Sequence, residues 1–176
     1  MAGGAPVAAR VSRGIQKRGY AWKKHYGESA PGCRFVQHPV QISNDKERRQ
    51  FITGVTPLQP KLIVLDTLAT MTVGMDENDT GEMGRFTAAC REIANALEAT
   101  VLVIHHPTKG DPNGYRGSYQ LEGNFDAMIR VKRDENNDLQ LHCAKQKDED
   151  KFPDFNVSVQ SITLSEATGE HDAITS

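Results

Sequence analysis

The sequence predicts an α/β fold with a mostly parallel sheet. Residues 61–66 and 100–105 are apolar runs of strand length, rich in β-branched side chains, and a segment with helical periodicity lies between them. Strands that alternate with helices in this way are typical of parallel sheets. Apolar runs without polar alternation are typical of covered strands, so we expect both strands to be buried on both faces.

The amino-terminal third predicts two helices and one short strand. Apolar residues recur at helical spacing over 7–22, which predicts the first helix. Residues 33–36 form a short strand candidate. Asn44 and Glu47 resemble a capping box, and we expect the second helix to continue to about Val55.

A loop over 68–79 and then a helix separate the two apolar runs. That helix carries apolar side chains at helical spacing, which predicts one buried face: Met83, Phe86, Cys90, Ile93 and Leu97. Residues 107–118 are rich in glycine and proline and predict a long mobile loop. Such loops often carry binding or catalytic residues.

The carboxyl-terminal third predicts three more strands. Two of them, at 127–132 and 139–145, are joined by a polar turn, and a third is expected at 157–164. We expect one domain over 1–164 and a polar, flexible tail over 165–176.

The composition indicates a soluble cytoplasmic protein. The 176 residues contain no apolar run of the length that a membrane span needs, about 20 residues. The basic amino terminus lacks the apolar segment of a signal peptide. Three cysteines, odd in number and far apart, exclude a disulfide framework or a CxxC metal site and indicate a reducing compartment.

The net charge of −2 conceals an asymmetry along the chain. Residues 1–50 carry ten Lys/Arg and three Asp/Glu, a net +7. Residues 51–133 carry eight and ten, a net −2, and residues 134–176 carry three and ten, a net −7. A basic amino-terminal third suits a nucleic acid partner, although a solvated helix face has the same composition.

Asp66 is the first candidate site residue. It follows four apolar residues at the carboxyl end of the first apolar run and precedes Thr67. Parallel sheets bind ligands at this end of their strands. Four apolar residues and then Asp have the Walker B form, in which the carboxylate holds Mg²⁺, usually through water. An Asp that caps the following loop has the same pattern, so both roles stay open.

His105 and His106 repeat this geometry at the end of the second run. We therefore expect the two strand ends to lie side by side. A histidine there can hydrogen-bond a phosphate, and a structural histidine is the alternative. A zinc site with Asp66 is a third interpretation, but adjacent strand residues point to opposite faces, so both histidines are not expected to bind one metal.

Two later segments carry positive charge. Arg116 lies in the glycine-rich loop, and arginine suits bidentate phosphate contact. Lys109 and Tyr115 in the same loop suit a nucleic acid partner, because tyrosine stacks on bases. Lys145 and Lys147 share one side of a strand end and can reach a phosphate on a neighbouring subunit. An exposed loop with incidental charge is the alternative for the loop residues. For the two lysines the alternative is that charged side chains at a strand edge keep the protein soluble.

The order of these features resembles the carboxyl two-thirds of a RecA-type P-loop ATPase. The resemblance covers roughly residues 3–164 and is most specific at 61–67, 101–109, 116–126 and 144–148. It is similar in particular to the RepA-type replicative helicases of plasmids and phages and to their AAA-family relatives. The Lys-x-Lys segment resembles the ending of the DnaB type.

The resemblance implies a RecA-like core in a ring-shaped homo- or hetero-oligomer that hydrolyses ATP with Mg²⁺ and moves along single-stranded DNA in replication or recombination. It assigns a role to each candidate: Asp66 and Thr67 at the Walker B end, His105 or His106 as γ-phosphate sensor, Arg116 as a trans-acting arginine finger, Lys145 and Lys147 as intersubunit contacts, and the loop with Lys109 and Tyr115 as the DNA-facing segment.

The Walker A loop of that family, G-x-x-x-x-G-K-[ST], does not occur in these 176 residues. The phosphate cradle and the water-activating glutamate are therefore expected to be missing. A truncated reading frame, a separate amino half that carries Walker A, and a degenerate non-catalytic subunit each explain this. Because the family's P-loop strand lies beside the His-bearing strand, we expect unpaired strand edges and a marginally stable chain, or one that pairs with another chain.

Two main classes of function remain. The first is a motor subunit that is complete only with an amino half, and it predicts a Walker A sequence directly upstream. The second is a binding or assembly module that lends Arg116 to a neighbour's nucleotide, and it predicts DNA or partner binding without ATP hydrolysis. A metal hydrolase is the third, and it predicts a bound metal.

Overall fold

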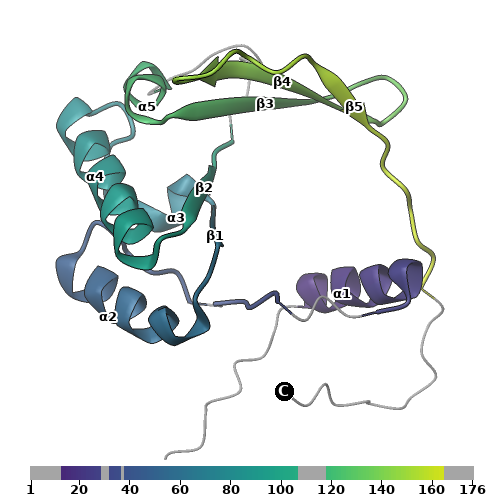
Figure 1. Ribbon diagram of the computed structural model, residues 1–176, viewed down its shortest axis with the longest axis horizontal. Coiled ribbons are helices and arrows are strands. Elements are labelled where there is room, and N and C mark those ends of the chain that lie inside the picture. The colour runs from purple at the N-terminus through teal and green to yellow at the C-terminus, as the bar shows by residue number, and fades with distance from the viewer. Residues whose placement is uncertain (1–12, 29–31, 37, 107–117, 165–176) are drawn as a thin grey trace, which may run out of the picture. The chain divides into compact units, whose positions relative to one another are not determined.

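The computed structural model describes residues 13–28, 32–36, 38–106 and 118–164 (Figure 1). The chain forms two compact units: Pro39–Ser158 is one, and Met1–His38 with Val159–Ser176 is the other. The predicted loop over 107–118 and the predicted tail fall almost wholly outside the described residues.

The described part of the smaller unit contains one helix, α1 (Arg13–Tyr26), which confirms the first predicted helix where it is described. The strand predicted at 33–36 is wrong, because these residues pair with no strand in the described chain. Phe35 and Val36 are exposed. A run of four extended residues gains no ladder hydrogen bonds unless another strand lies beside it.

The larger unit begins with α2 (Asp45–Val55), as predicted. The Asn44 side chain accepts hydrogen bonds from the backbone N–H groups of Lys46 (3.0 Å) and Glu47 (3.2 Å). The reciprocal half of the capping box differs from the prediction, because the Glu47 carboxylate accepts from the N–H of Gln41 (2.9 Å). A short 3₁₀ turn (Thr56–Leu58) ends this region.

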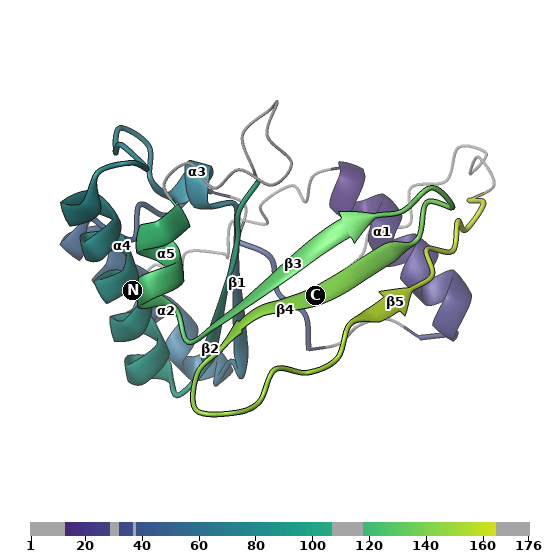
Figure 2. The same ribbon diagram turned by 90° about the horizontal axis from the view of Figure 1, so that it is seen from above.

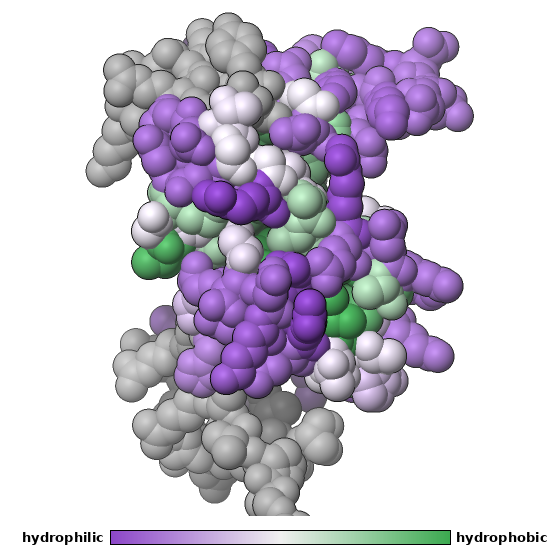
Figure 3. Space-filling model, turned by 90° about the vertical axis from the view of Figure 1, so that its left-hand side faces the viewer, coloured by the Kyte–Doolittle hydropathy of each residue, from purple (hydrophilic) through white to green (hydrophobic). Residues whose placement is uncertain are grey.

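The two apolar runs form a parallel pair, β1 (Leu62–Asp66) and β2 (Thr100–Ile104), with Leu62 opposite Thr100. The crossover between them is α4 (Thr80–Leu97), and its predicted apolar face is buried as expected. In both ribbon views α2 and α4 lie on the same side of this strand pair (Figures 1 and 2). Seen from that side, the surface is mostly hydrophilic with small apolar patches (Figure 3).

The prediction that both strands are covered on both faces is wrong. Ile63 and Leu65 join the core with α4, but Leu62 is 55% exposed, Val64 50% and Leu102 42%. An apolar run indicates that both faces of a strand can be buried. Burial of the second face also requires a second layer of structure that covers it. Among the described residues only one layer, made by α2 and α4, covers this sheet.

The segment predicted as a loop over 68–79 contains a short helix, α3 (Leu68–Met71). The Thr70 hydroxyl accepts from the N–H of Thr67 (2.9 Å) and donates to the carbonyl oxygen of Thr67 (2.7 Å). Leu68 is fully buried in the core. A helix of four residues is too short to show helical periodicity in the sequence.

The remaining strands form an antiparallel sheet in the order β3–β4–β5, which corrects the expectation of a mostly parallel sheet. Here β3 (Ala127–Arg133) and β4 (Leu139–Gln146) form the predicted hairpin. The last strand, β5 (Phe155–Val157), is shorter and earlier than the predicted 157–164. A seven-residue helix, α5 (Ser118–Asn124), precedes the sheet. Its Leu121 belongs to the same hydrophobic core as the buried face of α4.

The cysteines differ in accessibility. Cys33 is exposed, whereas Cys90 and Cys143 are buried. Burial raises the pKa of the Cys90 thiol to about 12. In the part of the chain that the structure describes, no helix is both long and apolar enough to cross a membrane.

Candidate functional site

The carboxyl ends of β1 and β2 lie side by side, as the sequence predicted. Asp66 is the register partner of Ile104, so His105 continues the chain directly beside the end of β1. His105 is half-buried and His106 is exposed. The parallel register therefore brings the carboxylate and the two histidines to one edge of the sheet, where α/β folds bind ligands.

The Asp66 carboxylate is open at this edge. Its residue is exposed, and it accepts no hydrogen bond from any residue that the structure describes. The turn after β1 is closed by Thr67 and Thr70 rather than by Asp66, and the Asp66–Thr67 peptide bond is cis. No hydrogen bond among the described residues therefore supports the loop-capping interpretation of Asp66. Both carboxylate oxygens of Asp66 are available to a hydrated cation.

Asp66 also belongs to the uncovered face of the strand pair. Side chains alternate along a strand, and Ile63 and Leu65 face the core. Asp66 therefore shares its face with Leu62 and Val64, and its register partner Ile104 with Leu102. A group that covered this apolar face would lie next to the open carboxylate.

Gln41 holds the segment that follows Asp66, a role that the sequence did not predict. Its side-chain N–H donates to the carbonyl oxygen of Thr70 (3.1 Å), and its side-chain oxygen accepts from the N–H of Val73 (3.2 Å). One amide side chain thus fixes α3 and the turn after it. No local pattern marks this residue, because its partners lie 29 and 32 positions away.

The two candidate lysines are engaged within the chain. The Lys145 ammonium donates to the carbonyl oxygen of Glu122 and lies 3.5 Å from that of Gly123. The Lys147 ammonium lies 3.7 Å from a carboxylate oxygen of Asp126. Both contacts tie the end of β4 to α5 and the residues after it. The other candidates in the later segments, Lys109, Tyr115 and Arg116, lie outside the described residues.

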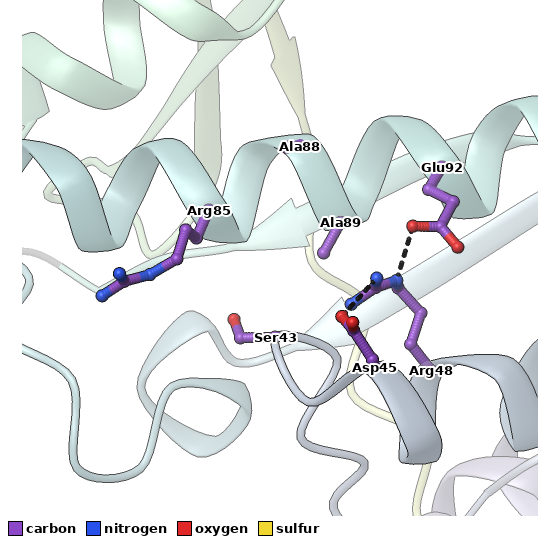
Figure 4. Close-up of a pocket in the computed structure, with 7 residues that line it drawn as sticks. All are labelled: Ser43, Asp45, Arg48, Arg85, Ala88, Ala89 and Glu92. Carbon is purple, nitrogen blue, oxygen red and sulfur yellow. Dashed lines mark hydrogen bonds and ion pairs between the residues drawn. The ribbon is translucent and has the colours of Figure 1, made fainter.

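A second polar cluster surrounds Arg48, between the start of α2 and the middle of α4 (Figure 4). The buried guanidinium donates to Glu92 (2.8 Å), Asp45 (2.7 Å) and the carbonyl oxygen of Ile42 (2.8 Å). Burial acts to lower the pKa of Arg48, but these carboxylates outweigh it and raise the pKa. The cluster lines a cavity of about 220 Å³ that contains none of the candidate residues.

A third polar site lies on the antiparallel sheet. Arg130, Lys132, Gln140, His142 and Asp154 line a cavity of about 210 Å³. Arg130 is the register partner of His142, whose Nδ1 lies 2.7 Å from a carboxylate oxygen of Asp154. Neither this cavity nor the one at Arg48 contains a group of acids, histidines and cysteines suited to a metal. In the described residues no such group of three or more occurs.

The fold and site define the chain as an α/β protein with a candidate ligand site at the carboxyl ends of parallel strands, of the kind that nucleotide-binding proteins use. The family model of the AAA domain matches residues 7–112, which is more than half of the chain. The chain therefore belongs to the AAA domain family, a family of P-loop-type ATPases. No curated protein matches the chain.

The family match includes some candidates and excludes others. Asp66, Thr67, His105 and His106 lie within it, at the carboxyl ends of β1 and β2, and the matched residues also include Lys109. The match ends at residue 112, before Arg116 and before the antiparallel sheet. The matched region of this chain therefore contains the open carboxylate and the two histidines.

Proposed function

We propose that the chain is a subunit of an ATP-driven helicase of the RepA or DnaB type, which acts on single-stranded DNA in an oligomeric ring. An ATPase-type function follows from membership of the AAA domain family. The helicase assignment rests on the order of motifs along the sequence, from the strand that ends in Asp66 to the Lys-x-Lys segment.

The observation that carries the proposal is the open carboxylate of Asp66 beside His105. The in-register pair of β1 and β2 places them at one sheet edge. Asp66 would hold Mg²⁺ through water, and Thr67 would lie against the same ligand. His105 or His106 would contact the γ-phosphate. Mg²⁺ neutralises charge on the phosphates when it is bound, which is its usual role in phosphoryl transfer.

The phosphate loop would come from a Walker A segment outside these 176 residues. The uncovered apolar face of Leu62, Val64 and Leu102 supports this, because parallel strands are usually covered on both faces. The outer edge of β2 also pairs with no described strand. A segment that covers this face and pairs with this edge would bring its phosphate-binding amides close to Asp66.

The test is to co-express the chain with the polypeptide encoded immediately upstream and to measure Mg²⁺-dependent ATP hydrolysis by the purified complex. We expect turnover by the complex, none by the chain alone, and loss of turnover in Asp66→Asn. Asp150→Asn removes another exposed carboxylate and should leave turnover unchanged. Full activity of the Asp66→Asn complex, or turnover by the chain alone that Asp66→Asn abolishes, would show that the proposed division of the site is wrong.

A non-catalytic assembly partner is the second candidate function. The exposed apolar face of β1 and β2 favours it, and so do their outer edges, which pair with no described strand, because such surfaces suit association whether or not ATP is hydrolysed. In this case the chain would lend Arg116 to a competent neighbour. Arg116→Ala should then reduce the ATPase rate of an intact homologue mixed with the chain by about 10³. Unchanged turnover in that mixture would remove the finger assignment.

A further inference from the structure

The helix α1 is strongly basic along its whole length. Arg13–Tyr26 contains five Lys or Arg and no Asp or Glu, and its last turn carries Lys23, Lys24 and His25. Such a helix has no internal ion pairs to neutralise it. Its charge therefore favours an anionic partner.

The same helix carries exposed aromatic rings. Tyr20 is 46% exposed, Trp22 47% and Tyr26 58%. The Trp22 and Tyr26 rings lie in contact, with centroids 4.3 Å apart. A spacing of four residues places Arg18, Trp22 and Tyr26 in one stripe along the helix. The stripe thus presents two neighbouring rings with a guanidinium at one end.

We propose that α1 is a binding surface for single-stranded nucleic acid, distinct from the loop that contains Lys109 and Tyr115. Bases stack on Trp22 and Tyr26, and backbone phosphates contact Arg18 and Lys23. This combination of aromatic rings and cations is how proteins bind single strands without reading their sequence. The inference rests on the proposed single-stranded DNA partner and names a second surface for it.

The charge on α1 favours this partner over an apolar one. Five cations and no acid on one helix would not stabilise packing against an apolar surface, whereas they attract the phosphates of a nucleic acid. Lys24 already donates to the carbonyl oxygen of Thr163 (2.6 Å), within its own unit. Arg18 and Lys23 are exposed: Arg18 lies one turn before Trp22 in the stripe, and Lys23 directly follows Trp22 in the sequence.

Trp22 makes the test direct, because it is the single tryptophan of the chain. Oligothymidylate added to the full chain should quench Trp22 fluorescence, and the binding constant should match the one from anisotropy of a labelled oligothymidylate. Tyr26→Ala should weaken binding about tenfold, as for the loss of one stacked base. Phe35→Ala removes an exposed ring outside the helix and should not change the affinity.

The charge contribution is tested through salt. Arg18→Ala with Lys23→Ala should lower the slope of log affinity against log salt by roughly 1.4, about 0.7 for each phosphate contact on a single strand. Arg49→Ala, which removes an exposed arginine of α2, should leave the slope unchanged. Circular dichroism of each variant checks that the total helix content is unchanged.

The two readouts separate the possible failures. No anisotropy change at all overturns the single-stranded DNA partner of the proposed function. Normal anisotropy with an unchanged Trp22 signal, and unchanged affinity in the α1 variants, overturns the α1 surface alone. A Trp22 shift with anionic lipid vesicles but not with oligothymidylate also overturns it, in favour of a membrane surface.

Discussion

The two sheets of the Pro39–Ser158 unit differ in how well they are covered. The β1–β2 pair is backed by α2 and α4, and this region holds most of the buried apolar residues. In the β3–β4–β5 sheet Cys143 is the one fully buried residue among those described, and Ile129, Val131, Phe155 and Val157 are exposed. We therefore expect the β1–β2 region to contribute most of the free energy of unfolding. The β3–β4–β5 sheet contributes less because most of its side chains are exposed to solvent.

Phe86→Ala should produce the largest loss of stability. Phe86 is completely buried in α4, so the change leaves a cavity in the core and should cost about 3–5 kcal/mol of unfolding free energy. Phe155→Ala in the antiparallel sheet should cost about 1 kcal/mol, because that ring is half exposed. Denaturant unfolding of both variants measures the contrast, and equal losses would contradict it.

Arg48→Ala should cost about 2 kcal/mol, because it leaves the carbonyl oxygen of Ile42 buried and two carboxylates without their partner. The neighbouring Arg49 is exposed, so Arg49→Ala should change stability by less than about 0.5 kcal/mol. Thermal and denaturant unfolding distinguish the two. A loss for Arg48→Ala as small as that of its neighbour would show that the cluster contributes little.

Asn44→Ala should cost about 1 kcal/mol, because its side chain caps the first turn of α2. Asn95 lies on the exposed side of α4 and caps nothing, so Asn95→Ala is the matched control and should not destabilise the chain. The unfolding midpoints of the two variants give the comparison. A destabilised control with an unaffected Asn44→Ala would reverse it.

Val64→Thr should have the smallest effect on the chain alone, less than about 0.5 kcal/mol, because the side chain lies on the uncovered face of β1. The same change should weaken the complex with the upstream polypeptide, which we propose covers this face. Unfolding of the chain and co-purification of the complex measure these two effects. A large loss of stability in the isolated chain would mean that this face is already covered.

The sequence predicted the features whose causes are local. The apolar face of α4 repeats at helical spacing, and the layer that it packs against lies in the same chain, so Phe86 and Ile93 are buried as expected. Asn44 precedes the helix that it caps. The parallel pairing of the two apolar runs, and with it the placing of Asp66 beside Ile104, also follows from the strand–helix–strand order.

The sequence did not predict the features that depend on distant partners. An apolar run cannot show whether a second layer exists, so Val64 was expected to be buried and is half exposed. Gln41 and Arg48 act through contacts with later parts of the chain, and neither carries a local pattern. The strands β3 and β4 were predicted. The bounds of β5 were not, because the strand that pairs with β4 is only the short segment 155–157.

The three cysteines allow thiol chemistry to follow the opening of each region in time. Cys33 is exposed and should be modified at once by a thiol reagent. Cys143 is buried in β4 and should react only when the antiparallel sheet opens. Cys90 of α4 is buried in the core, and its pKa is raised to about 12. It should react last, because the reactive thiolate forms readily only after the core has opened and exposed the thiol to water. Mass spectra taken during labelling would thus give three separate modification rates, one for each cysteine, in one chain without substitutions.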